Sequence, residues 1–129
     1  MRVPHELLSE EFNEDPSIGL RARELRDAHQ FPPSYYTHPL LRFADCLWVP
    51  LSIFMDGVRY SVTDSVVGIW VINWVTGRRH LCGLVRKRLV CRCGCKGWCT
   101  YWPILNFIKW SLEQLKLGLF PSQRHDGGA

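Results

Sequence analysis

Three runs with strand-like patterns occupy the middle of the chain, separated by turn signals, and the second is rich in β-branched and aromatic side chains. These runs lie at residues 47–55, 66–75 and 78–89, with Asp56-Gly57 and Thr76-Gly77 between them. The second run is apolar on both faces of an extended chain, which is typical of a central strand covered on both sides. The pattern therefore predicts three antiparallel strands joined as a meander.

The strongest helical pattern follows the strands, in residues 101–117. Thr100 is placed to cap this helix, Pro103 falls in its first turn and Gly118 is placed to end it. Its apolar stripe consists of Leu105, Ile108, Leu112 and Leu115, widened by Trp102, Phe107 and Leu119. The predicted class is α+β, with a three-stranded antiparallel meander, a cysteine-rich loop, one covering helix and an N-terminal helical arm.

The N-terminal third has weaker signals. Residues 5–14 indicate an acidic helix or a frayed tail, and residues 17–29 a weakly apolar helix that packs loosely or on a partner. Prolines then predict an extended linker whose aromatic side chains, Phe31, Tyr35 and Tyr36, dock on the body. The predicted organisation is a helical arm, a Pro/aromatic linker, an αβ body and a disordered tail, at residues 1–30, 31–46, 47–121 and 122–129.

Charge is unevenly distributed along the chain. Residues 1–27 hold seven acids and four bases, whereas residues 28–129 hold twelve bases and five acids. A basic body suggests a polyanionic partner, with nucleic acid as the candidate. The alternative is that the charge serves solubility, since the net charge of the chain is only +4.

Basic residues cluster at the two ends of the third predicted strand and are the candidate nucleic-acid contacts: Arg78, Arg79, Arg86, Lys87 and Arg88. Interleaved with Trp74 and Trp98, they could track a phosphate backbone. The alternative is a solvated edge whose charges block sheet aggregation. The tryptophans expected in the core are Trp48, Trp70, Trp74, Trp102 and Trp110.

No signal peptide or membrane span is expected. The first twenty residues carry acids without an apolar core, and no apolar run approaches the roughly 20 residues of a spanning helix. We expect an intracellular location, with the nucleus as one candidate compartment. In a reducing compartment the cysteines are thiols or metal ligands rather than disulfides.

Four of the six cysteines lie within nine residues, at Cys91, Cys93, Cys95 and Cys99. Zinc takes four thiolate or imidazole ligands in a tetrahedron, and the glycines of this segment allow the sharp turns that so local a site needs. Zinc is the favoured interpretation, with Cys82 or His80 available to complete the set. A metal-free reduced loop and a redox-active or disulfide loop are the alternatives.

Asp56 is expected at the end of the first strand, before Gly57. A carboxylate at such a place could hold a catalytic metal, whereas an Asp-Gly turn residue is the interpretation that residue chemistry alone favours. Hydrolysis with two metals needs several carboxylates. After Asp64 the chain offers only Glu113 and Asp126.

The runs Ile53–Val58, Thr76–His80 and Cys91–Cys99 together resemble a repetitive, mobile-element-like protein family of large algal genomes. The resemblance covers about residues 32–121, and its most specific part is the motif CxCGCxGWC. A weaker resemblance is to transposases with an RNase H-like core. That fold opens with three antiparallel strands and a helix, and its first catalytic acid lies on the first strand, where Asp56 stands.

The transposase resemblance implies a partial RNase H-like fold, because the later strands and acids have no counterpart here. Three functions stay open. The first is a transposase-like, nucleic-acid-associated fragment with a zinc-stabilised loop, not catalytic alone. The second is a small zinc-dependent module that meets a protein partner; separately, six tryptophans and an incomplete sheet edge suggest that the chain needs a partner or a missing C-terminal remainder for stability. The third is a thiol redox protein.

Overall fold

The centre of the molecule is a three-stranded antiparallel sheet in the order β1-β2-β3. The strands are β1 (Leu51–Arg59), β2 (Ser65–Asn73) and β3 (Arg79–Arg86), in a computed structural model that describes residues 1–43, 47–118 and 121–127. The predicted meander and the central place of β2 are confirmed. A bulge between Ile69 and Trp70 shifts the pairing of β2 with β3.

The first strand begins and ends later than the sequence pattern predicts. Asp56 and Gly57 continue β1 and pair with residues of β2 instead of ending the strand. The chain turns after β1, where the Tyr60 hydroxyl donates a hydrogen bond to the Asp64 carboxylate at 2.7 Å. Asp-Gly is a turn signal only where the partner strand also stops. The prediction that Asp56 lies at a strand end is therefore wrong.

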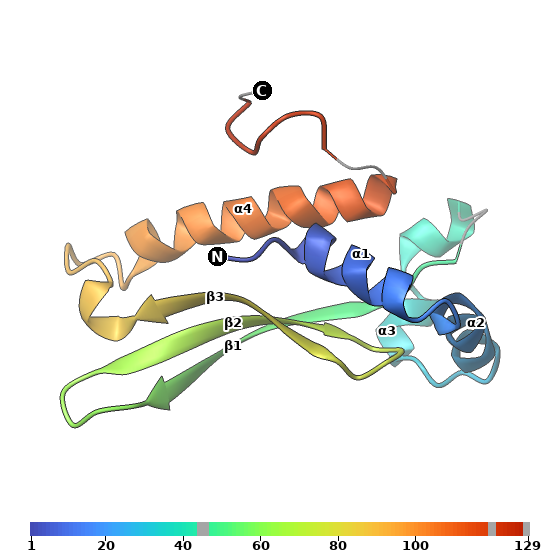
Figure 1. Ribbon diagram of the computed structural model, residues 1–129, viewed down its shortest axis with the longest axis horizontal. Coiled ribbons are helices and arrows are strands. Elements are labelled where there is room, and N and C mark those ends of the chain that lie inside the picture. Colours follow the sequence, from blue (N-terminus) through green and yellow to red (C-terminus); the bar gives the residue numbers. More distant parts are fainter. Residues whose placement is uncertain (44–46, 119–120, 128–129) are drawn as a thin grey trace.

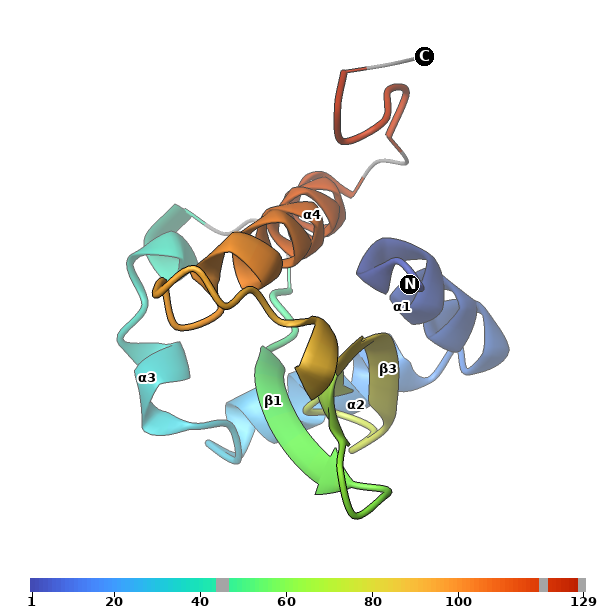
Figure 2. The same cartoon turned by 90° about the vertical axis from the view of Figure 1, so that its left-hand side faces the viewer.

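Two helices cover one face of the sheet, as Figures 1 and 2 show. They are α1 (Pro4–Glu14) and α4 (Trp98–Leu117). The core beneath them contains Leu7 and Leu8 from α1, Val71 from β2 and Cys82 from β3. The predicted C-terminal covering helix is confirmed, and α1 shares the same face with it.

The last helix starts earlier than predicted. It begins at Trp98, so Thr100 lies inside its first turn and Pro103 lies further along the helix. Gly118, with a φ of 67°, ends it as predicted, whereas Leu119 is outside the described residues. Neither α4 nor any other helix in the described ranges is long and apolar enough to cross a membrane.

A second core lies at one end of the sheet, beneath α2 (Ile18–Asp27). Ile18 and Ala22 are completely buried there, together with Phe31 and Val75. The loose packing expected for this helix is therefore not found. An amphipathic helix needs only a narrow apolar stripe, and these small side chains fit closely against the β2–β3 turn.

The proline-rich segment is more regular than predicted. It contains a short α-helix, α3 (Pro33–Tyr36), and a 3-10 helix, η1 (Pro39–Phe43). Each begins at a proline, which is tolerated there because the first N–H of a helix has no hydrogen-bond partner within the helix. The expected docking of the aromatic residues is confirmed, because the Tyr35 hydroxyl donates to the Trp48 carbonyl at 2.7 Å. Residues 44–46 of the predicted linker lie outside the described residues.

The second face of the sheet is largely open (Figure 1). Phe54 and Trp70 stack on it with ring centroids 6.1 Å apart, and both are only partly buried. Val58 and Leu84 on the flanking strands are 57% and 60% exposed. The prediction that β2 is covered on both sides is therefore correct for one face and wrong for the other.

A buried carboxylate holds α1 to the sheet. Glu11, only 3% exposed, accepts hydrogen bonds from the Thr76 hydroxyl, the Asn73 amide at 3.4 Å and His80 Nε2 at 2.6 Å. Burial raises the pKa of Glu11, but these hydrogen bonds outweigh it, so the pKa is below its ordinary value.

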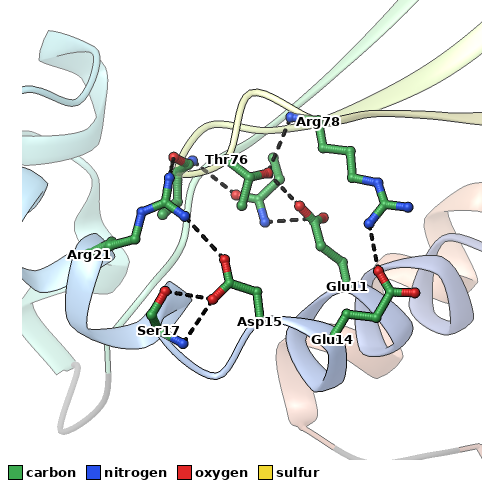
Figure 3. A network of polar contacts seen from close by, with 9 residues as sticks. Glu11, Glu14, Asp15, Ser17, Arg21, Thr76 and Arg78 are labelled. Atoms are coloured by element: carbon green, nitrogen blue, oxygen red, sulfur yellow. Dashed lines mark hydrogen bonds and ion pairs between the residues drawn. The ribbon is translucent and has the colours of Figure 1, made fainter.

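An outer ring of ion pairs surrounds this cluster, as Figure 3 shows. Arg78 meets Glu14 at 2.9 Å. Arg21 reaches both the Asp15 carboxylate at 3.1 Å and the Val75 carbonyl at 3.2 Å. The junction of α1 and α2 is thereby tied to the β2–β3 turn from both sides.

Replacing Glu11 with alanine should lower the free energy of unfolding by about 3 kcal/mol, because the buried Asn73 and His80 and the partly buried Thr76 lose their acceptor. Urea titration followed by tryptophan fluorescence measures this. Glu14→Ala is the matched control on the same helix, and its exposed pair with Arg78 should contribute less than about 1 kcal/mol. Equal losses in the two variants would contradict the assigned role of Glu11.

The stability should also depend on pH through Glu11. Its pKa is lower in the folded chain than the ordinary value of 4.5. Its contribution is therefore complete above that value and is lost as the pH falls through the folded-state pKa. The stability difference between the wild type and Glu11→Gln should shrink as the pH falls from 6 to 3, and a difference independent of pH would be inconsistent with an ionised Glu11.

Candidate metal centre

The cysteine loop connects the end of β3 to the start of α4. After β3 the chain forms one turn of 3-10 helix, η2 (Lys87–Leu89), and then an irregular loop up to residue 97. Gly94 and Gly97 have φ values of 95° and 89°, and Lys96 has 57°. These left-handed conformations favour glycine and fold the loop back on itself.

Folding of the loop brings all four predicted ligands together. The sulfur atoms of Cys91, Cys93, Cys95 and Cys99 lie within 4.8 Å of one another. A tetrahedral zinc centre with Zn–S bonds of 2.3 Å places its sulfurs about 3.8 Å apart. The Sγ atoms of Cys93 and Cys99 are 3.7 Å apart, which already matches one edge of that tetrahedron. These four cysteines could hold a metal ion.

Backbone N–H groups point at two of the sulfurs. The Cys99 N–H, in the first turn of α4, donates to Cys95 Sγ at 3.3 Å, and the Cys93 N–H donates to Cys91 Sγ at 3.4 Å. Partial positive charge at a helix N-terminus stabilises an anion placed there. These N–H groups therefore favour the thiolate form of the two sulfurs that they contact.

The pKa values of the thiols reflect their crowding. The Cys99 N–H and the Cys93 side chain lower the pKa of Cys95 to about 6. The pKa of Cys99 is raised to about 12, chiefly by its hydrogen bond with Cys95, and that of Cys91 is raised chiefly by Cys93. Adjacent thiolates repel, so ionisation of Cys95 favours the protonated forms of Cys91 and Cys99. A divalent cation would relieve that repulsion and release the remaining protons.

Contacts to α4 and to the end of β3 brace the loop. The Cys91 N–H donates to the Thr100 hydroxyl at 2.9 Å, so Thr100 holds the loop instead of capping the helix. A Cβ built on Gly97 would lie 2.7 Å from Val90 Cγ1. Glycine is therefore required at position 97 both for its φ and for the close approach of Val90.

The other two proposed ligands do not join the cluster. Cys82 is 1% exposed in the core beneath α1, where burial raises its pKa to about 11. His80 is bonded to Glu11. The idea that either completes the metal set is wrong, because both side chains face the helix-covered side of β3. A second histidine, His5, bonds Ser111 at 3.0 Å and is also part of the interior.

Asp56 lies in the middle of β1 with an exposed side chain. Among the described residues, the cysteine cluster is the only group of three or more metal-ligating side chains, so Asp56 belongs to no such group. Its proposed catalytic role stays a prediction. The side chain is exposed within the strand and does not lie at the strand end, where the sequence pattern predicts it.

The five basic candidates lie at opposite ends of β3, an eight-residue strand that spans roughly 26 Å. Arg78 and Arg79 lie near the acidic α1, where Glu14 pairs with Arg78 and raises its pKa. Arg86, Lys87 and Arg88 lie at the end that carries the cysteine loop, which Figure 2 views directly.

Sequence reasoning missed part of that basic end. Arg59 from β1 and Arg92 from the cysteine loop line the same pocket as Lys87 and Arg88. Pairing across a hairpin brings Arg59 there, and no local pattern in the sequence reveals it. Glu11 was missed as well, although its spacing from Leu7 and Leu8 places it on the apolar face of α1.

Two tryptophans expected in the core are exposed. Trp102 is 50% exposed and packs against Trp98, itself 53% exposed, with ring centroids 5.0 Å apart. Trp74, at the opposite end of the sheet, is 45% exposed and donates to the Ser52 hydroxyl. Trp102 lies one turn before Leu105 on the predicted apolar stripe, but the structure leaves it half exposed beside Trp98.

Comparison with known proteins identifies no relative. No protein-family model, curated protein or solved structure matches this chain.

Gly97→Ala should lower the free energy of unfolding by about 3 kcal/mol, because a methyl group meets Val90 in a left-handed residue. Gly94→Ala is the matched control, since it has a φ of 95° but nothing within 4 Å of a new Cβ. It should cost only about 1 kcal/mol. Urea unfolding separates the two effects, and equal costs would show that the approach of Val90 is unimportant.

Proposed function

We propose that the protein is a small zinc-binding module whose metal centre holds the cysteine loop against the start of α4. The observation that carries this proposal is the four sulfurs within 4.8 Å of one another. Two of them receive backbone hydrogen bonds, as thiolate ligands do. Zinc is the ion that four thiolates in a tetrahedron favour.

The metal would act as a cross-link. Cys91 follows η2 and Cys99 lies in α4, so one ion would join the end of the sheet to the covering helix. Apart from Thr100, few contacts in this region perform that task, because both described apolar cores lie elsewhere. Binding free energy would therefore become folding free energy for this end of the molecule.

Association with nucleic acid is the second part of the proposal. Arg86, Lys87 and Arg88 adjoin Arg92 beside the metal loop, and this gathering of positive charge supports contact with phosphates. A transposase-like origin stays a hypothesis that rests on the resemblance of the sequence motifs. Among the described residues Asp56 belongs to no group of three or more metal-ligating side chains, and this supports a binding role over a catalytic one.

Native mass spectrometry of chain purified in the presence of zinc should show one zinc ion per chain. Cys93→Ser and Cys99→Ser should each reduce zinc affinity by at least tenfold, because serine is a poor zinc ligand at neutral pH. Cys82→Ala removes a cysteine outside the cluster and should retain one zinc ion. Chelation should lower the melting temperature of the wild type more than that of Cys93→Ser, because the variant binds zinc more weakly.

A wild-type chain that binds no zinc, or a Cys82→Ala variant that loses it, would overturn the metal centre. A redox protein would behave differently. Mild oxidation would form a disulfide among the four thiols even in the presence of saturating zinc, whereas a structural zinc centre should protect them.

A further inference from the structure

We propose that the end of the molecule that carries the cysteine loop binds single-stranded nucleic acid. Phosphates would enter a basic pocket beside the loop, and bases would stack on Trp98 and Trp102. This inference rests on the proposed metal centre, because the loop holds both parts.

The pocket lies between the β1–β2 turn and η2 and has a volume of about 750 Å³. Its basic residues come from separate parts of the chain. Arg59 donates to the carbonyls of Ser61 and Val62, so it supports the turn. The pocket is also lined by Thr63 and Ser65, whose hydroxyls can bond phosphate oxygens.

The charges of the pocket are not all neutralised. Arg88 pairs with Asp64 at 3.5 Å, and the Arg88 N–H also donates to that carboxylate. Lys87 and Arg92 are exposed, and within the described residues no ion pair reaches either one. Arg86 and Lys96, nearby in the chain, are exposed as well. An anion that bridges Lys87 and Arg92 would therefore pair with two positive charges that form no ion pair within the described part of the protein.

The tryptophan pair supplies the second contact. Trp98 and Trp102 lie in the first two turns of α4, inclined at 37° to each other and each about half exposed. Large exposed aromatic side chains side by side are costly on a soluble surface unless something covers them. Bases of a single strand stack on such rings regardless of sequence.

The metal loop links these two contacts. Arg92 stands between the ligands Cys91 and Cys93, and Trp98 directly precedes the ligand Cys99. An ion that gathers these sulfurs would therefore fix the backbone on both sides of Arg92 and next to Trp98. The cation and the aromatic ring would be held at a set separation, as recognition of both phosphate and base requires.

A single strand fits this surface better than a duplex. The faces of paired bases are hidden within the stack, so the tryptophans would find no partner on a duplex. None of the basic residues forms the exposed helical row that enters a major groove, since they come from a strand end, a 3-10 turn and loops.

The test uses fluorescence anisotropy of a labelled oligothymidine with zinc-loaded full-length chain. Trp98→Leu and Trp102→Leu should each weaken binding roughly five-fold to a hundred-fold. Trp74→Leu, which alters an exposed tryptophan at the far end of the sheet, should leave affinity unchanged. Lys87→Ala and Arg92→Ala should each reduce the slope of log K against log salt by about 0.7, whereas Arg79→Ala should not.

Unlabelled single strand should compete at least tenfold better than the same sequence as a duplex, and better than heparin at equal charge. Equal competition by duplex or by heparin would overturn the inference, as would unchanged binding by both tryptophan variants. Zinc content is measured on every sample. A chain that holds zinc but fails these tests refutes only the nucleic-acid surface, whereas a chain without zinc refutes the metal centre itself.

Discussion

A carboxylate removed from water must find its hydrogen bonds inside the protein, and Glu11 finds them on the β2–β3 hairpin. The same helix places Leu7 and Leu8 over β2, so the polar anchor and the apolar cover act together. Because α1 covers only part of this face, α4 lies beside it and reaches the end of the sheet that carries the cysteine loop (Figure 1). The start of α4 is thereby held where the cysteine loop must close.

The two ends of the sheet are stabilised by different chemistry. Buried hydrogen bonds and a small aromatic core hold the end near α2. At the other end, the Thr100 hydroxyl and the packing of Gly97 against Val90 hold the cysteine loop, and four thiols are crowded together within it. Crowded thiols repel when ionised, and a cation shared among them would remove that repulsion.

Much of the fold could be predicted from local patterns. The meander, the covering helix and its end at Gly118 follow from periodicity, and the cysteine spacing identified the four clustered sulfurs. Long-range choices could not be predicted. Asp56-Gly57 is a turn signal in the sequence, and only its pairing with β2 shows that it continues a strand. Glu11 has the sequence pattern of a surface charge, and only the fold brings Asn73, Thr76 and His80 to it. Each of these depends on a residue far along the chain.

The separation of the two stabilised ends implies that the molecule can open in parts. Amide hydrogens of β2 near Val71 belong to the core that α1 covers, and they should exchange with solvent only when the whole molecule unfolds. Amides around Cys93 and the first turn of α4 depend on local contacts alone and can fray while the rest stays folded. With the proposed metal centre, metal supply would change the stability of this end and leave the rest of the protein folded.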